Sequence, residues 1–161
     1  MINRGLTLGK YTPFHRGHQL VIETALREID ELIVLVYDSP QVTDVPLAMR
    51  VGWIKAIYPM VQVIEAWDGP QEVGYTAEIK KRHENYILKL LDGIMITHFY
   101  SSEPYGKHIS QALGAINRTV DLHRKIEPIS ATEIRADLHR NRRFLHPLVY
   151  TELVDWEKRT F

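Results

Sequence analysis

The 161-residue sequence contains no cysteine. This absence excludes a disulfide framework, a thiolate metal site and a cysteine nucleophile. Long hydrophobic runs are also missing, because the longest apolar stretch, around Leu32 to Tyr37, is far shorter than a membrane-spanning helix. The N-terminal residues likewise lack the apolar core of a signal peptide. We therefore expect a cytoplasmic protein with no membrane partner.

The sequence has no excess charge of either sign, since 20 Lys and Arg balance 20 Asp and Glu. This balance argues against a nucleic-acid partner, because such binders gain affinity from many cation–phosphate contacts. The charge is nevertheless uneven along the chain. Residues 118–143 carry 7 basic and 4 acidic side chains. This local excess of cations favours a small anionic ligand.

The apolar content of 45% is too high for a disordered chain. The length suits one hydrophobic core, and no linker or internal repeat divides the sequence. We therefore expect a single domain over residues 1–161.

Apolar periodicity predicts strands that alternate with helices. The predicted strands cover residues 6–9, 31–37, 61–64, 94–98 and 118–122. The predicted helices cover residues 17–29, 46–59, 76–91, a segment from 104, a segment within 130–139, and 148–156. This order indicates an α/β fold, with a doubly wound parallel sheet of about five strands and helices on both faces. In such folds, ligands bind beyond the carboxyl ends of the strands.

The first motif that indicates chemistry is the segment from Gly9 to His18, where a strand turns into a helix. The start of a helix offers unpaired N–H groups to an anion, and Gly17 lets a phosphate approach the backbone. His15 and His18 are three residues apart, so both imidazoles can face the same phosphate. A metal site is the alternative interpretation, but no third ligand appears in a recognisable spacing, and we predict none.

The second motif runs from Ile129 to Arg135. The spacing of Ser130 and Glu133 is that of a capping box, so the segment has a purely structural explanation as a helix start. Arg135, three residues after Thr132, favours a functional one. A hydroxyl, a helix N-terminus and a guanidinium can then converge on one anion such as a pyrophosphate leaving group.

The segments from Thr12 to His18 and from Ile129 to Arg135 together resemble the two signature motifs of the HxGH nucleotidyltransferase superfamily. Within it, the chain is most similar to nicotinamide-mononucleotide (NMN) adenylyltransferases, including the adenylyltransferase domain of the bacterial bifunctional NAD-biosynthesis regulator and the archaeal enzymes. The resemblance extends over most of the chain. It implies a Rossmann-like fold and a direct transfer of AMP from ATP to NMN, which yields NAD and pyrophosphate.

The resemblance also implies roles for individual residues. The catalytic set consists of Lys10, His15, His18 and Arg135. The expected ATP-binding set consists of Gly9, Tyr11, Thr12, Phe14, Gly17, Ser101, Arg124, Ile129, Ser130 and Thr132. The expected acceptor-binding set consists of Tyr37, Asp38, Arg50, Trp67 and Tyr75.

The identity of the acceptor is the open point, because Tyr75 stands where similar enzymes stack the nicotinamide ring on a tryptophan. Another acceptor such as phosphopantetheine, the use of CTP, and a non-catalytic nucleotide sensor are therefore alternatives. The resemblance further implies Mg²⁺ bound with ATP, and a homo-oligomer.

Overall fold

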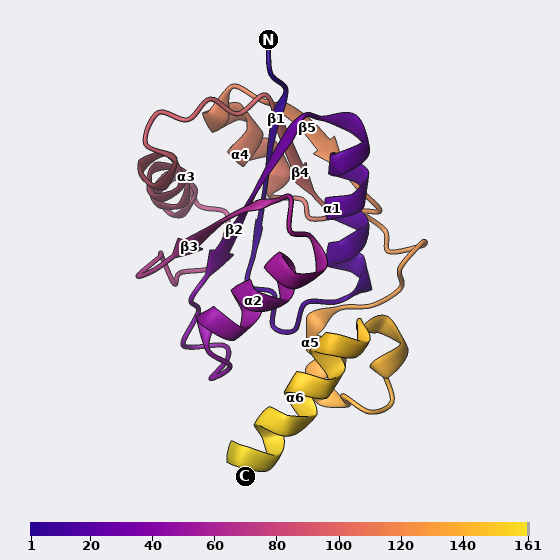
Figure 1. Ribbon diagram of the computed structural model, residues 1–161. Helices are drawn as coiled ribbons and strands as arrows, with labels where there is room; N and C mark the ends of the chain where they lie inside the picture. The colour runs from indigo at the N-terminus through magenta and orange to yellow at the C-terminus, as the bar shows by residue number, and fades with distance from the viewer. Residues whose placement is uncertain (161) are drawn as a thin grey trace.

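The computed structural model describes residues 1–160, which form one five-stranded parallel sheet with helices on both sides (Figure 1). The strands are β1 (Arg4–Gly9), β2 (Glu31–Tyr37), β3 (Gln62–Ala66), β4 (His98–Ser101) and β5 (Ile116–Thr119). The helices are α1 (Arg16–Glu28), α2 (Leu47–Ile57), α3 (Ala77–Leu91), α4 (Gly106–Leu113), α5 (Ala131–Ala136) and α6 (Pro147–Thr160), with a short 3₁₀ turn, η1 (Arg142–Phe144), before α6.

The strand order is β3-β2-β1-β4-β5, so the chain builds outward from β1 in one direction and then in the other. Leu6 at the centre of β1 pairs with Ile33 of β2 and with Phe99 of β4. The boundary between β1 and β4 is the topological switch point, where open parallel sheets place their ligands. The predicted fold class, a doubly wound Rossmann-like parallel sheet, is confirmed.

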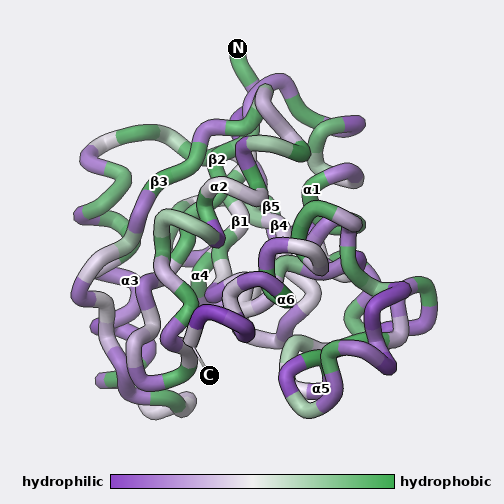
Figure 2. Tube along the Cα trace, turned by 60° about the horizontal axis from the view of Figure 1, so that its bottom comes forward, coloured by the Kyte–Doolittle hydropathy of each residue, from purple (hydrophilic) through white to green (hydrophobic). Residues whose placement is uncertain are grey.

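Two hydrophobic cores lie on opposite faces of the sheet. Val34 and Val36 of β2 point toward the core that α1, α2, α5 and α6 cover, whereas Ile33 and Leu35 point toward the core under α3 and α4. Such alternation follows from the two-residue period of a strand. The hydrophobic residues of β1, β2 and β4 accordingly lie inside the molecule, whereas β3 and β5 form the edges of the sheet (Figure 2).

The boundaries of two strands differ from the sequence prediction: the fourth strand lies later in the chain than predicted, and the fifth lies earlier. The fourth strand spans His98–Ser101 rather than residues 94–98, because a left-handed Asp92 ends α3 and the chain then turns, with the Ile94 N–H donating to Leu91. Ile94 and Ile96 therefore pack in the core without a place in the strand, whereas Met95 between them is exposed. The fifth strand spans Ile116–Thr119 rather than residues 118–122, because Asp121 adopts a left-handed conformation that breaks the ladder.

The C-terminal part of the chain lies at the carboxyl edge of the sheet, at the opposite end of the molecule from the N-terminus (Figure 1). α6 packs beside α2, where the Trp53 indole N–H donates a hydrogen bond of 2.5 Å to Glu152. Among the helices within residues 1–160, none has the length and apolarity to span a bilayer.

We predict that Trp53→Ala lowers the free energy of unfolding by about 3–5 kcal/mol, because the indole is 1% exposed and its removal leaves a cavity. Urea denaturation measures the change. Lys55→Ala, on the exposed face of the same helix, is the control and changes stability by less than about 0.5 kcal/mol. Equal losses in the two variants would contradict the packing role of Trp53.

Candidate active site

A cavity of about 490 Å³ opens at the carboxyl edge of the sheet, within the size range of small-molecule sites. Loops that follow all five strands contribute to its wall. Most of the residues selected from the sequence line it, namely Gly9, Lys10, Tyr11, Thr12, His15, Gly17, His18, Tyr37, Tyr75, Ser101, Arg124, Ile129, Ser130, Thr132 and Arg135. The two sequence motifs, more than a hundred residues apart, thus meet at one cavity.

His15 and His18 form a reciprocal cap at the start of α1. The His15 Nδ1 accepts a hydrogen bond of 3.0 Å from the backbone N–H of Gly17, and the His18 Nδ1 accepts one of 3.1 Å from the backbone N–H of His15. Their rings stack with centroids 3.7 Å apart. As predicted, the two imidazoles lie side by side at the helix N-terminus.

These hydrogen bonds determine where each imidazole carries its proton. A backbone N–H can only donate, so each Nδ1 must be unprotonated and each neutral ring holds its proton on Nε2. Burial, followed by the positive charge of Arg124, lowers the pKa of His15 from 6.5 to about 4. Burial, His15 and Arg124 lower the pKa of His18 well below 6.5. At neutral pH the pair therefore presents two uncharged N–H donors.

The packing around the pair keeps the rings in place. Phe14 does not line the cavity. Its ring stacks at 9° on His18 from within the core, with centroids 5.9 Å apart, and Tyr11 packs edge-on against the same imidazole. Gly17 is required for space, because a Cβ there would come within 2.8 Å of the His15 ring.

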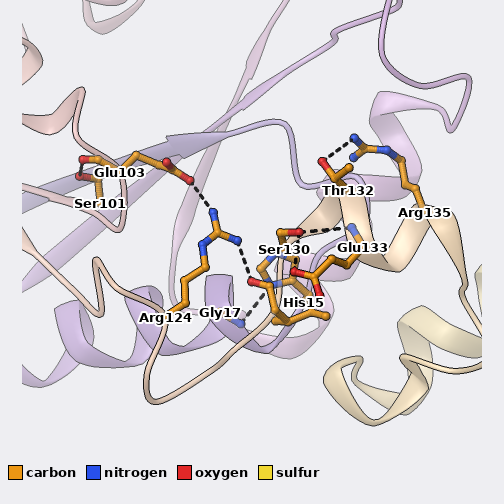
Figure 3. A network of polar contacts seen from close by, with 10 residues as sticks. His15, Gly17, Ser101, Glu103, Arg124, Ser130, Thr132, Glu133 and Arg135 are labelled. Atoms are coloured by element: carbon orange, nitrogen blue, oxygen red, sulfur yellow. Dashed lines mark hydrogen bonds and ion pairs between the residues drawn. The ribbon is translucent and has the colours of Figure 1, made fainter.

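The second motif connects directly to the first. Arg135 on α5 donates a hydrogen bond of 2.7 Å to the carbonyl of Thr12. Its second terminal nitrogen lies 3.4 Å from the Thr132 hydroxyl, as Figure 3 shows. Ser130 caps α5 by accepting from the Glu133 N–H, and its hydroxyl donates to the Glu133 carboxylate. Ser130 thus caps α5 as predicted, but Glu133 pairs with the Ser130 hydroxyl rather than with its backbone N–H, so the full capping box is not formed, and the motif lies in the cavity wall.

Arg124 joins the loops that follow β4 and β5. Its guanidinium donates 2.8 Å to the Ile129 carbonyl and 3.0 Å to the Glu103 carboxylate (Figure 3). Lys10, by contrast, has an exposed side chain at the mouth of the cavity. Lys10, Arg124 and Arg135 are thus the lysine and arginine side chains of the cavity wall, which also includes the carboxylates of Glu72, Glu103, Asp121 and Glu127.

Arg50 does not reach the cavity, although the sequence placed it in the acceptor-binding set. Its side chain is 1% exposed, and its guanidinium donates to the carbonyls of Lys10, Tyr37, Asp38 and Val45 at 2.6–3.2 Å. It thereby ties together the loops that follow β1 and β2. The structure gives Arg50 a supporting position beneath the cavity.

Two further residues of the acceptor-binding set also lie outside the wall of the cavity. The Asp38 carboxylate accepts from the backbone N–H groups of Ser39 and Asp68. Trp67 is 55% exposed and its indole donates to Glu65. Of the predicted acceptor residues, Tyr37 and Tyr75 line the cavity.

Sequence reasoning missed several residues of the cavity wall on the side of α4, including Tyr105 and His108. Both follow β4, which the apolar pattern placed four residues too early. The buried Phe99-Tyr100 pair was the signal that the strand continues past His98. A correct strand end would have directed attention to the residues that come next.

The fold and the cavity define a Rossmann-like α/β protein with a ligand site at the switch point of its sheet. The chain belongs to the cytidylyltransferase-like family, whose model matches residues 6–137. The resemblance to HxGH nucleotidyltransferases is thereby confirmed at the level of the family.

The curated relatives are named as nicotinamide-nucleotide or nicotinate-nucleotide adenylyltransferases. The chain is 48% identical to the nicotinamide-nucleotide adenylyltransferase of Saccharolobus solfataricus over 40 residues, which is 25% of this chain and 23% of that protein. It is 25% identical to the probable nicotinate-nucleotide adenylyltransferase of Nitratiruptor sp. over 167 residues, covering 91% and 93% of the two chains. The first relatives are thus matched over only about a fifth of their own length.

Solved structures share the fold. A bifunctional NMN adenylyltransferase/ADP ribose pyrophosphatase from Francisella tularensis superposes with a TM-score of 0.72 at 17% identity, covering 98% of this chain and 50% of that one. The NadR protein in complex with NAD and AMP-PNP superposes with a TM-score of 0.65 at 18% identity, covering 89% and 44%. At these identities the likeness concerns the fold.

We predict that Arg50→Lys lowers the free energy of unfolding by about 3 kcal/mol. A lysine cannot reproduce the forked donors, so buried carbonyls lose their partners. Thermal and urea denaturation measure the loss. Arg140→Lys, an exposed position, is the matched control and should stay within about 0.5 kcal/mol of the original protein. A wild-type stability for Arg50→Lys would contradict the supporting role.

We also predict that the histidine pair makes stability fall with acidification. Because the folded pKa values lie below 6.5, the unfolded chain binds protons first, so stability is complete above pH 6.5 and decreases toward pH 4. Each histidine contributes up to about 1.4 kcal/mol per pH unit in that window. Urea denaturation at several pH values should show a shallower decrease in a His15→Gln/His18→Gln double variant. The exposed His123→Gln control should follow the wild-type profile, and identical profiles for all three proteins would refute the prediction.

Proposed function

We propose that this protein is a nucleotidyltransferase that transfers AMP from ATP to nicotinamide mononucleotide, yielding NAD and pyrophosphate. The observation that carries this proposal is the pair of neutral imidazoles at the N-terminus of α1, whose Nε2–H groups are fixed as donors by backbone hydrogen bonds. Such oriented donors stabilise charge that develops on a phosphoryl oxygen in the transition state.

The chemistry requires no protein nucleophile. An oxygen of the 5′-phosphate of the acceptor attacks the α-phosphorus of ATP, and the bond from that phosphorus to the oxygen bridging the α- and β-phosphates breaks. The electron pair of the broken bond leaves with pyrophosphate. In this reaction, positioning and charge stabilisation do most of the work, as in phosphoryl transfer generally.

Each group at the cavity then has a role. His15 and His18 donate to the oxygens of the α-phosphate. Lys10, Arg124 and Arg135 meet the charge of the β- and γ-phosphates, and Ser130 and Thr132 add donors at the start of α5. Mg²⁺ enters with ATP as part of the substrate, because this ion keeps much of its water shell and binds through the phosphates.

The aromatic side of the cavity suits the acceptor. Tyr37 stacks with Tyr86, and Gly69 fits against both rings, so the Tyr37 ring is held in place. Tyr75 is 64% exposed at the cavity mouth. A pyridinium ring gains roughly 0.5–2 kcal/mol from such an aromatic face.

Nicotinate mononucleotide is the second candidate acceptor. The relative matched along 91% of this chain is named a probable nicotinate-nucleotide adenylyltransferase, whereas the shorter matches are named nicotinamide-nucleotide adenylyltransferases. The two acceptors differ in one group, a neutral amide against a carboxylate, so a direct comparison of rates decides between them.

Pyrophosphate release tests the proposal. Release is expected with ATP and nicotinamide mononucleotide, and at a lower kcat/KM with nicotinate mononucleotide, with phosphopantetheine, or with CTP in place of ATP. His18→Ala should lower kcat by about a hundredfold or more while the protein stays folded and binds ATP. If pyrophosphate were released faster with another pair of substrates, that pair would take the place of ATP and nicotinamide mononucleotide in the proposal. Tight ATP binding without release from any pair would indicate a nucleotide sensor, and full activity of His18→Ala would refute the assignment of the imidazole.

A further inference from the structure

The loop between β5 and α5 brings Arg124, in an unusual backbone conformation, into the wall of the same cavity as the histidine pair. Asp121 and Arg124 both have φ of 50°, in the left-handed region that non-glycine residues rarely adopt. The Arg124 N–H donates 2.9 Å to the Asp121 carbonyl and closes a tight turn. The loop therefore needs an interaction that holds this turn in place.

The Asp121 carboxylate supplies that interaction. Its Oδ1 accepts the backbone N–H of Lys125 at 2.8 Å and that of Ile126 at 3.0 Å, while its Oδ2 accepts the N–H of Glu127 at 3.0 Å. Three consecutive backbone donors thus converge on one side chain, and both of its oxygens are used. Although burial opposes it, these three donors and Arg124 together lower the pKa of Asp121, so the carboxylate stays charged at neutral pH.

From this turn the Arg124 side chain reaches the wall of the cavity, with 38% of the side chain still exposed. Its two end nitrogens meet Glu103 and the Ile129 carbonyl, next to Ser130 (Figure 3). Its charge acts on both His15 and His18. Glu103 fixes the end of this side chain, whereas Asp121 fixes the backbone from which it starts.

We propose that Asp121 is a positioning residue for the reaction: its carboxylate closes the 121–127 turn and thereby places Arg124 beside the histidine pair and the triphosphate. The proposal rests on the proposed function for its kinetic part. Asp121 lies in the cavity wall, but its two carboxylate oxygens are engaged by backbone N–H groups, so the proposal is that its effect passes through Arg124.

The test compares Asp121→Asn, Asp121→Gly, Arg124→Gln and the double variant Asp121→Asn/Arg124→Gln. Asparagine turns an N–H₂ group toward one of the backbone donors and so removes a hydrogen bond. Glycine adopts the left-handed conformation readily but has no carboxylate. Together, the two variants distinguish loss of the carboxylate contacts from a change in the backbone conformation. Asp137→Asn is the matched control, because the Asp137 carboxylate also accepts a backbone N–H, that of Arg140, outside the cavity.

Two measurements distinguish positioning from general support. Both Asp121 variants should lower kcat/KM for ATP by about a hundredfold. The double variant should be no slower than Arg124→Gln alone, because both substitutions remove the same contribution, that of the correctly placed Arg124 guanidinium. NMR titration of the free proteins should show the pKa of His15 moving upward toward 6.5 in the Asp121 variants and in Arg124→Gln, as the guanidinium moves away. Asp137→Asn should match the original protein in both measurements.

The proposal would be overturned if the loss of kcat/KM in the double variant equalled the product of the two single losses. It would also be overturned if the pKa of His15 were unchanged in folded Asp121 variants. Failure of both Asp121 variants to fold, with Asp137→Asn melting normally, would also overturn it, because Asp121 would then serve stability. The titration needs no substrate. If the original protein transfers no adenylyl group, the proposed function fails, while the titration still shows whether Asp121 places Arg124.

Discussion

The two hydrogen bonds from backbone N–H groups to the imidazoles at the start of α1 are the constraint on which the cavity depends. They use the helix cap, which most proteins satisfy with a short hydroxyl or carboxylate side chain, to orient two rings. Each ring is then committed to one tautomer, and burial keeps both uncharged. A pair of cationic imidazoles in contact would repel one another. Neutral donors avoid that repulsion and leave the balancing of phosphate charge to the lysine and arginine side chains around them.

The strands deliver these side chains to one edge by a shared backbone device. A non-glycine residue with a left-handed conformation lies two positions after the end of β1, β2, β3 and β5, at Tyr11, Ser39, Asp68 and Asp121. Each one ends its strand abruptly and turns the chain across the carboxyl edge. Such conformations are costly for residues with a Cβ, and they persist where surrounding contacts determine them. The contacts of Arg50 and Asp121 with neighbouring backbone groups are of that kind.

The sequence predicts the fold class and the meeting of the two motifs, because apolar periodicity reflects burial and the parallel order brings strand ends together. The prediction from sequence is wrong where an apolar segment is buried in the core but does not pair with a neighbouring strand. Ile94 and Ile96 have the pattern of a strand but pack under the sheet without joining it, so β4 was placed too early. The sequence also does not indicate where the side chain of Arg50 lies. The sequence does not indicate whether a charged side chain near a predicted site points into the site or away from it. The four carbonyl groups that accept from Arg50 come from segments that only the folded chain brings together.

Contacts that only the folded chain makes also explain how a protein with zero net charge can offer free cations at its cavity. The charge count reflects the whole surface, whereas the field in a cavity depends on which carboxylates are already engaged. Of the four carboxylates in the cavity wall, Asp121 is occupied by backbone donors, Glu103 is paired with Arg124 and Glu72 is paired with Arg82, which leaves Glu127 without an ion pair among the contacts of residues 1–160. Lys10 and the unused N–H groups of Arg135 face the cavity without a carboxylate partner among the contacts of residues 1–160. An incoming triphosphate therefore meets Lys10 and Arg135 as free cations, whereas at Arg124 it competes with Glu103 for the guanidinium.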